Sequence, residues 1–182
     1  MSWLGTIRWG ALVVAALATV MAQISFIRFL PSPWYHLPLL AILTFFLILI
    51  IDGRIGFGFG LAGGLMLEWW SPLVPGAQLL SLVIGMLVVN WLFKAFFTNR
   101  SLVSLVLLSG IGVVVSQLFI AAAFSVSYWL NLSWYHWSMD WGYWSALWWQ
   151  LVFMVLGQVA LFLGVRTFSK RMHSVFLMTG RR

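Results

Sequence analysis

Long apolar runs with almost no charge are the feature that most constrains the fold of this chain. Of its 182 residues, 63% are hydrophobic and only 7% are charged. A typical soluble domain carries about 25% charged residues. A soluble protein of this length needs a polar surface, and this sequence has too few charged side chains to supply one. The sequence therefore predicts an integral membrane protein that lies in the lipid bilayer.

The apolar runs divide the chain into six segments of roughly membrane-spanning length. A transmembrane helix needs about 20 apolar residues, and Gly, Pro or charged residues interrupt this sequence at comparable intervals. The expected spans are residues 9–27, 37–51, 55–70, 77–97, 102–124 and 144–165. The second and third are short, so a tilted, broken or re-entrant path stays open for them. We expect an all-α polytopic fold, with a six-helix transmembrane domain over residues 1–168 and a basic cytoplasmic tail over 169–182.

The basic residues predict the orientation of these spans. With the N-terminus in the cytoplasm, nine of the ten Lys and Arg residues lie on the cytoplasmic side and only Arg28 lies outside. This distribution follows the positive-inside rule and predicts that both termini are cytoplasmic. The net charge of +7 is then explained by topology, and nucleic acid is not an expected partner. The first run also resembles a cleavable signal segment, an alternative that leaves the rest of the topology unchanged.

The third span combines glycine with carboxylate. Gly56, Gly60 and Gly64 recur every four residues, so on a helix they form one strip without side chains. Such a strip predicts close packing against a neighbouring helix. Asp52 and Glu68 stand at the two ends of the span. Asp52 is interpreted as part of a solvated turn, whereas Glu68 either reaches the interface or has a function at membrane depth, where an ionisable group is costly.

Two glutamines lie near the middle of the last two spans. Gln117 is in the fifth and Gln158 is in the sixth. Amide side chains in transmembrane helices form hydrogen bonds across helix interfaces. We therefore predict that both contribute to packing between helices.

An aromatic segment precedes the last span. Residues 128–144 contain five Trp and three Tyr, residue types that concentrate at membrane interfaces. The plain interpretation is a segment lying along the outer leaflet. The sharper hypothesis is a docking surface for a partner, because Trp and Tyr dominate binding hot spots. Its candidate contact residues are Trp134, Trp137 and Trp141.

A metal or acid–base site is the weakest hypothesis for this chain. His136 and Asp140 are four residues apart and would share a helix face. Two ligands do not complete a catalytic zinc site, and nothing in the sequence requires His36 to join them. The chain has no Cys. We therefore expect no cofactor, no metal and no enzymatic activity.

The order of features over about residues 20–115 resembles the MreD family of bacterial rod shape-determining membrane proteins. The motifs that carry the resemblance are DGR at 52–54, the glycine-rich span ending in LMLE at 65–68, SPLVPG at 71–76 and FFTNRSL at 96–102. The family commonly has Asp at the position of Glu68. The tryptophan-rich segment at 128–144 has no counterpart in the family pattern.

The resemblance implies a fold, a location and a set of partners. The fold would be a bundle similar to the substrate-binding subunits of energy-coupling-factor transporters, in the bacterial inner membrane. The protein would be a non-enzymatic scaffold that acts with an MreC-type membrane protein and other components of the peptidoglycan elongation machinery. Asp52, Arg54 and Glu68 match polar positions of the family and are candidates for partner contact or bundle integrity.

Two other classes stay open from the sequence. One is a substrate-binding membrane subunit for uptake of a small, vitamin-type molecule, which requires a polar or aromatic pocket that opens to the outside. The other is a membrane-embedded enzyme that uses His36, His136 and Asp140.

Overall fold

The computed structural model describes residues 3–71, 75–96, 101–129 and 141–179, with side chains described between residues 9 and 167 except at position 28. These residues form helices joined by short connections, and no strand occurs among them. The all-α expectation is therefore confirmed. The elements in chain order are α1 (Trp3–Ser25), η1 (Ile27–Phe29), η2 (Trp34–His36), α2 (Leu39–Phe46), η3 (Leu47–Ile51), α3 (Gly53–Trp69), α4 (Ala77–Phe96), α5 (Leu102–Trp129) and α6 (Trp141–Thr179).

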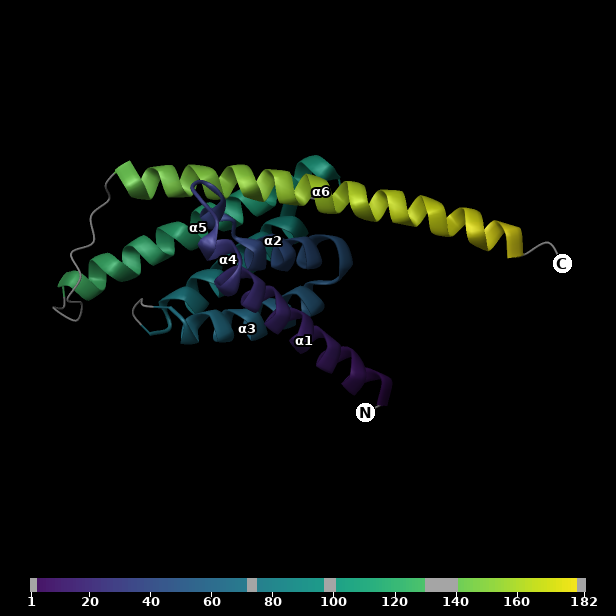
Figure 1. The fold of residues 1–182 in the computed structure, drawn as a ribbon, viewed down its shortest axis with the longest axis horizontal. Coiled ribbons are helices and arrows are strands. Elements are labelled where there is room, and N and C mark those ends of the chain that lie inside the picture. Colours follow the sequence, from purple (N-terminus) through teal and green to yellow (C-terminus); the bar gives the residue numbers. More distant parts are fainter. Residues whose placement is uncertain (1–2, 72–74, 97–100, 130–140, 180–182) are drawn as a thin grey trace.

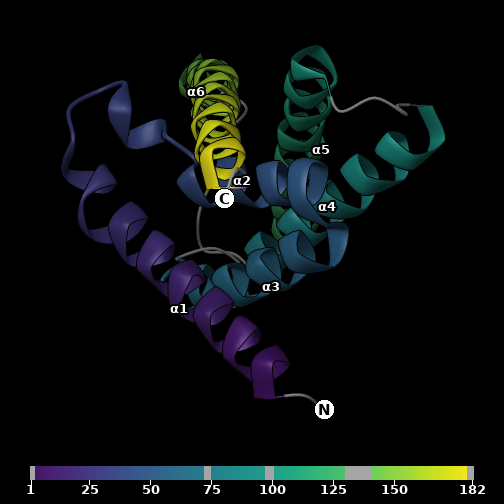
Figure 2. The same ribbon diagram turned by 90° about the vertical axis from the view of Figure 1, so that its right-hand side faces the viewer.

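The helices form a bundle around α2. In Figure 1, α5 and α6 run in opposite directions across the molecule, and α6 extends past the other helices toward the C-terminus. Figure 2 shows α1 and α3 on one side of α2, with α5 and α6 on the other. The last helix continues to Thr179, so the tail expected from residue 169 begins within α6.

Within the part of the chain that the structure describes, three helices are long and apolar enough to cross a membrane: Ala77–Phe96, Leu102–Trp129 and the Trp141–Thr167 part of α6. The Trp9–Ser25 part of α1 and the helix Leu39–Ile51 are further apolar segments of shorter length. The described parts of all six expected segments are mostly helical, and the length criterion supports a membrane protein with at least these three long apolar helices.

The second apolar run forms the centre of the bundle. α2 contacts each of the other five α-helices. Together with η3, a π-helical turn, it covers Leu39–Ile51, which is about 20 Å of helix and is shorter than the roughly 30 Å hydrocarbon core. A helix that is apolar on every face is suited to burial inside a protein. The run at 37–51 is therefore apolar because it packs inside the bundle, and its helix is continuous and ends in the π-helical turn Leu47–Ile51.

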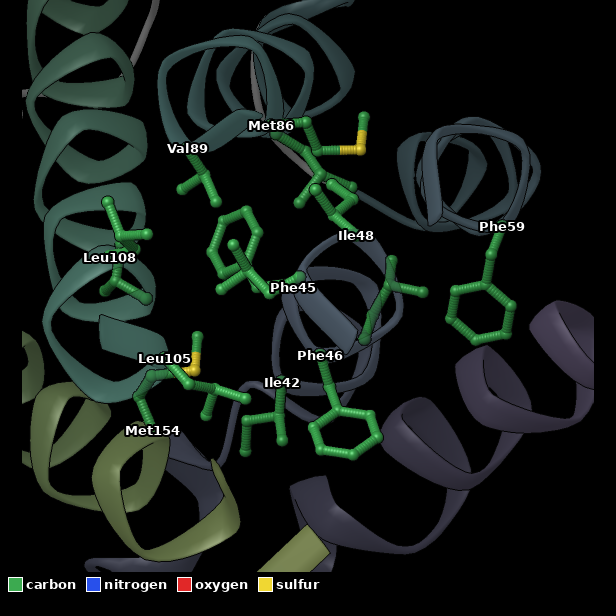
Figure 3. Packing of buried hydrophobic residues seen from close by; sticks show 14 of the residues in the cluster. Ile42, Phe45, Phe46, Ile48, Phe59, Met86, Val89, Leu105, Leu108 and Met154 are labelled. Carbon is green, nitrogen blue, oxygen red and sulfur yellow. The ribbon is translucent and has the colours of Figure 1, made fainter. Parts of the chain in front are cut away.

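The side chain of Phe45 connects α2 to α4 and α5 (Figure 3). It is fully buried, and its ring lies against Gly85 and Gly112. A Cβ atom at Gly112 would lie 2.9 Å from Cζ of Phe45, closer than real Cβ contacts allow. Val89 and Leu108, both fully buried, complete the surroundings of this ring. Glycine at the crossing of α4 and α5 thus makes room for an aromatic side chain from the central helix.

The outward faces of the bundle are strongly apolar. Trp91, Leu118 and Leu156 are each more than half exposed on α4, α5 and α6. Large apolar surfaces of this extent are unusual on soluble monomers. They are the expected surface of helices that face lipid.

Candidate functional site

The glycines of α3 face the central helix in antiparallel register. The facing pairs are Gly56 with Ile48, Gly60 with Thr44, and Gly63 with Leu40. A Cβ atom at any of these glycines would overlap the facing side chain. Gly64 instead lies against Leu79 and Leu82 of α4. The strip of Gly56, Gly60 and Gly64 is therefore buried inside the bundle and shared between two neighbouring helices.

Glu68 binds the start of α4. Its Oε1 accepts a hydrogen bond from the Gly76 N–H at 2.6 Å, and its Oε2 accepts one from the Leu79 N–H at 2.9 Å. The first N–H groups of a helix have no partner within the helix, and a negative charge there is also favoured by the helix dipole. Gly76 has a φ of +89°, a conformation suited to glycine. The acid, the turn and α4 therefore form one connected unit.

Asp52 has a similar but weaker role at the start of α3. Its Oδ1 accepts a hydrogen bond from the Arg54 N–H at 3.1 Å, and both residues are exposed. Asp52 is thus the N-cap of α3, consistent with its interpretation as a turn residue. Trp141, at the start of α6, is 84% exposed.

The remaining sequence candidates are only partly placed. Trp134, Trp137, His136 and Asp140 lie outside the described residues. His36 is described and lies in η2. Within the described ranges no group of three or more His, Cys, Asp or Glu side chains lies close enough to hold a metal ion.

A cavity of about 320 Å³ lies where α1 and α3 end and where α2 and α4 begin. Its wall also includes the middle of α5 and Gln150 of α6. The volume is at the lower end of the range for small-molecule sites. Tyr35 and Trp70 line the cavity and are 46% and 59% exposed, so it opens at this end of the bundle.

The cavity wall is polar although the chain is not. The whole sequence contains five glutamines, and four of them line this one cavity: Gln23, Gln78, Gln117 and Gln150. Three serines join them: Ser71, Ser81 and Ser116. In an apolar chain, polar groups at membrane depth are costly and mark candidate functional sites.

Three of these glutamines also stabilise the walls. The Leu40 N–H donates to Oε1 of Gln23 at 2.9 Å, which satisfies a free donor at the start of α2. Nε2 of Gln117 donates to Oε1 of Gln150 at 2.6 Å, which joins α5 to α6. In addition, Nε2 of Gln158 donates to the carbonyl of Ile42 at 3.0 Å. The prediction that Gln117 and Gln158 form hydrogen bonds across helices is confirmed.

The cavity wall carries no formal charge at pH 7 among the described lining residues. Among these described residues, the group that titrates near neutrality is His36. Partial burial lowers the pKa of His36 below its ordinary value, because desolvation disfavours the imidazolium form. His36 is therefore neutral at pH 7, and its ring lies 3.9 Å from that of Tyr35, centroid to centroid.

Sequence reasoning did not find this cavity. It assigned Gln117 to helix packing and did not single out Gln23 or Gln150. One signal was available in the sequence. In the predicted topology, the four glutamines of the cavity wall all lie between the middle and the outer end of their spans, so they share the outer half of the membrane.

The described helices and their exposed apolar faces define a helical membrane protein with a polar cavity at one end. Scans against protein-family models, curated proteins and solved structures found no match to this chain.

Proposed function

We propose that this chain is an MreD-like scaffold subunit of the bacterial peptidoglycan elongation machinery. The observation that carries the proposal is the α3–α4 unit, in which Glu68 binds the backbone of the turn and the first turn of α4. The motifs that resemble the MreD family are concentrated in this part of the chain. Their glycines, acid and turn have connected structural roles, which supports interpreting them together as one structural unit.

The proposal includes a topology with six crossings of the inner membrane and both termini in the cytoplasm. The charge distribution supports it. The helix ends support it as well, because α1 and α3 end at the same end of the bundle where α2 and α4 begin. In this orientation the cavity opens to the outside, and the DGR turn at 52–54 faces the cytoplasm.

Single cysteines test this topology, because the chain has none of its own. Ser32 and Lys94 are both exposed and lie on opposite sides of the proposed membrane. In intact spheroplasts, a membrane-impermeant maleimide is expected to label Ser32→Cys, and to label Lys94→Cys only after lysis. Labelling of Lys94→Cys before lysis, with Ser32→Cys protected, would reverse the orientation.

The partner is the central test of the scaffold proposal. A tagged chain crosslinked in its bacterial host is expected to retain an MreC-type membrane protein or a wall synthase, identified by mass spectrometry. Because the glycine strip and Glu68 are engaged inside the bundle and Asp52 caps α3, Arg54 and Trp141 remain as exposed partner contacts among the described candidates. Loss of a central Trp from an interface commonly costs about 2 kcal/mol or more, which is about thirtyfold in affinity, so Trp141→Ala is expected to reduce recovery by about thirtyfold.

Trp148→Ala is the matched control for this experiment. Trp148 is also on α6 and is 64% exposed, but it lies deeper in the apolar part of the helix, where we assign it to lipid. Its loss is expected to leave recovery unchanged. Equal losses for both variants would argue against a specific role for Trp141, and the absence of all wall proteins from the wild-type sample would refute the scaffold proposal.

A second function, a substrate-binding subunit of a small-molecule uptake transporter, is favoured by the cavity. That class requires a polar or aromatic pocket that opens to the outside, and the cavity is polar, has aromatic residues at its mouth and opens outward in the proposed topology. The same crosslinking experiment separates the two functions. Recovery of an ATPase pair with a coupling subunit, without wall proteins, would select the uptake function.

A further inference from the structure

The hydrogen-bonding capacity that the cavity wall leaves unused limits what the cavity can bind. Within the described residues, the hydroxyls of Ser81 and Ser116 donate to carbonyls of their own helices. Each hydroxyl oxygen therefore keeps acceptor capacity. Gln23 and Gln78 use Oε1 as an acceptor, so each keeps an NH₂ donor. The wall thus offers donors and acceptors together, without a charge.

The Gln117–Gln150 pair presents the most specific of these groups. Its single hydrogen bond uses Nε2 of Gln117 and Oε1 of Gln150. Oε1 of Gln117 and Nε2 of Gln150 have no other partner among the described residues, so an acceptor and a donor remain on two joined amides. Amide groups of this kind pair with the planar N–H and C=O edges of heterocycles. The hydrogen bond between the two amides restricts their orientation, which reduces the entropy lost on binding.

The aromatic rings at the mouth fit the same ligand chemistry. Tyr35, His36 and Trp70 all line the cavity. Planar heterocycles stack on such rings, a contact worth about 1–3 kcal/mol per base in nucleic-acid complexes. Because His36 is neutral and the described lining residues include no Lys, Arg, Asp or Glu, these residues supply no counter-ion for a charged ligand.

We propose that this cavity binds a small uncharged heterocycle through a lactam-type N–H/C=O edge, with the N–H donating to Oε1 of Gln117 and the C=O accepting from Nε2 of Gln150. The volume of about 320 Å³ corresponds to roughly ten water molecules at ~30 Å³ each, which suits a one-ring or two-ring molecule. The inference rests on the cavity and not on the identity of any protein partner.

Equilibrium binding of radiolabelled uracil to the full chain in lipid nanodiscs tests the proposal. Uracil is neutral and planar and carries the required edge. Saturable binding is expected, with competition by unlabelled uracil. 1,3-Dimethyluracil keeps the ring but has no N–H donor, and it is expected to compete at least about tenfold less well, because a site built for a hydrogen bond rejects an analogue that lacks it.

Variants connect the binding to the cavity. Gln117→Leu and Gln150→Leu are each expected to weaken uracil binding by about tenfold or more. Ala41→Phe adds a ring at the cavity wall without deleting a polar group, and it is expected to abolish binding. Ser125→Ala, at an exposed position of α5 outside the lining, is expected to bind like the wild type. Thermal unfolding followed by Trp fluorescence identifies any variant that fails to fold.

Three results would overturn the proposal. They are the absence of saturable uracil binding by the wild type, equal competition by 1,3-dimethyluracil, and equal competition by glucose, which is neutral and hydrogen-bonding but has no planar edge. Each is independent of which proteins the crosslinking experiment recovers, so failure here and failure of the scaffold proposal are distinguishable.

Discussion

Gly60→Leu is expected to prevent the bundle from assembling. Gly60 is buried where α3 meets both the central helix and α4, and a Cβ atom there would overlap Met86 and lie 2.7 Å from Cγ2 of Thr44. Met86 and Thr44 are themselves fully buried, so neither has open space to move into. Overpacking a full core costs about 1–3 kcal/mol and occasionally more. Leucine adds four carbon atoms at a three-helix contact, so an effect at or above the top of that range is expected.

The measurement is the fraction of purified chain that elutes as a single species in mild detergent, together with its unfolding temperature from Trp fluorescence. Gly110→Leu is the matched control, because Gly110 is also inside an apolar helix, α5, but has no atom within 4 Å of an added Cβ. It is expected to elute and melt like the wild type. If Gly60→Leu behaves in the same way as Gly110→Leu, close packing at α3 does not hold this bundle together.

The periodicity of glycine predicted part of this arrangement. A repeat of four along α3 indicates a strip without side chains, and Gly56 and Gly60 do face the central helix. The sequence could not predict that Gly63, rather than Gly64, continues the register opposite Leu40. That depends on the crossing angle of the two helices, which is set by packing around both and is not encoded in the spacing along one of them.

The sequence also could not predict that α2 lies at the centre of the bundle. An apolar run is equally consistent with a helix facing lipid and a helix buried by other helices, since both surroundings are apolar. The short length of the run at 37–51 was the only available sign. The cavity was missed for a related reason. Gln23, Gln78, Gln117 and Gln150 lie on four different helices, so only the three-dimensional packing brings them together.

Glu68→Ala is expected to destabilise the protein by about 2–3 kcal/mol. The change removes both oxygens that accept from the Gly76 and Leu79 N–H groups, and hydrogen bonds to charged groups contribute about 1.5–3 kcal/mol each before solvent access is considered. Glu68 is half-buried and water replaces part of the loss, which places the expected effect near that of one such bond. The start of α4 is then expected to fray, so its amide protons exchange faster.

Hydrogen–deuterium exchange by mass spectrometry measures this directly in peptides covering residues 75–82, with the unfolding temperature as a second readout. Glu68→Gln keeps one oxygen acceptor and loses the charge, so it is expected to lie between the wild type and alanine. Asp52→Ala is the comparison at the start of α3, where one exposed bond of 3.1 Å is lost and an effect below about 1 kcal/mol is expected. If Asp52→Ala equals or exceeds Glu68→Ala, or if exchange near residue 76 is unchanged, Glu68 does not hold the start of α4. Its carboxylate would then be available for the partner contact that the family resemblance implies.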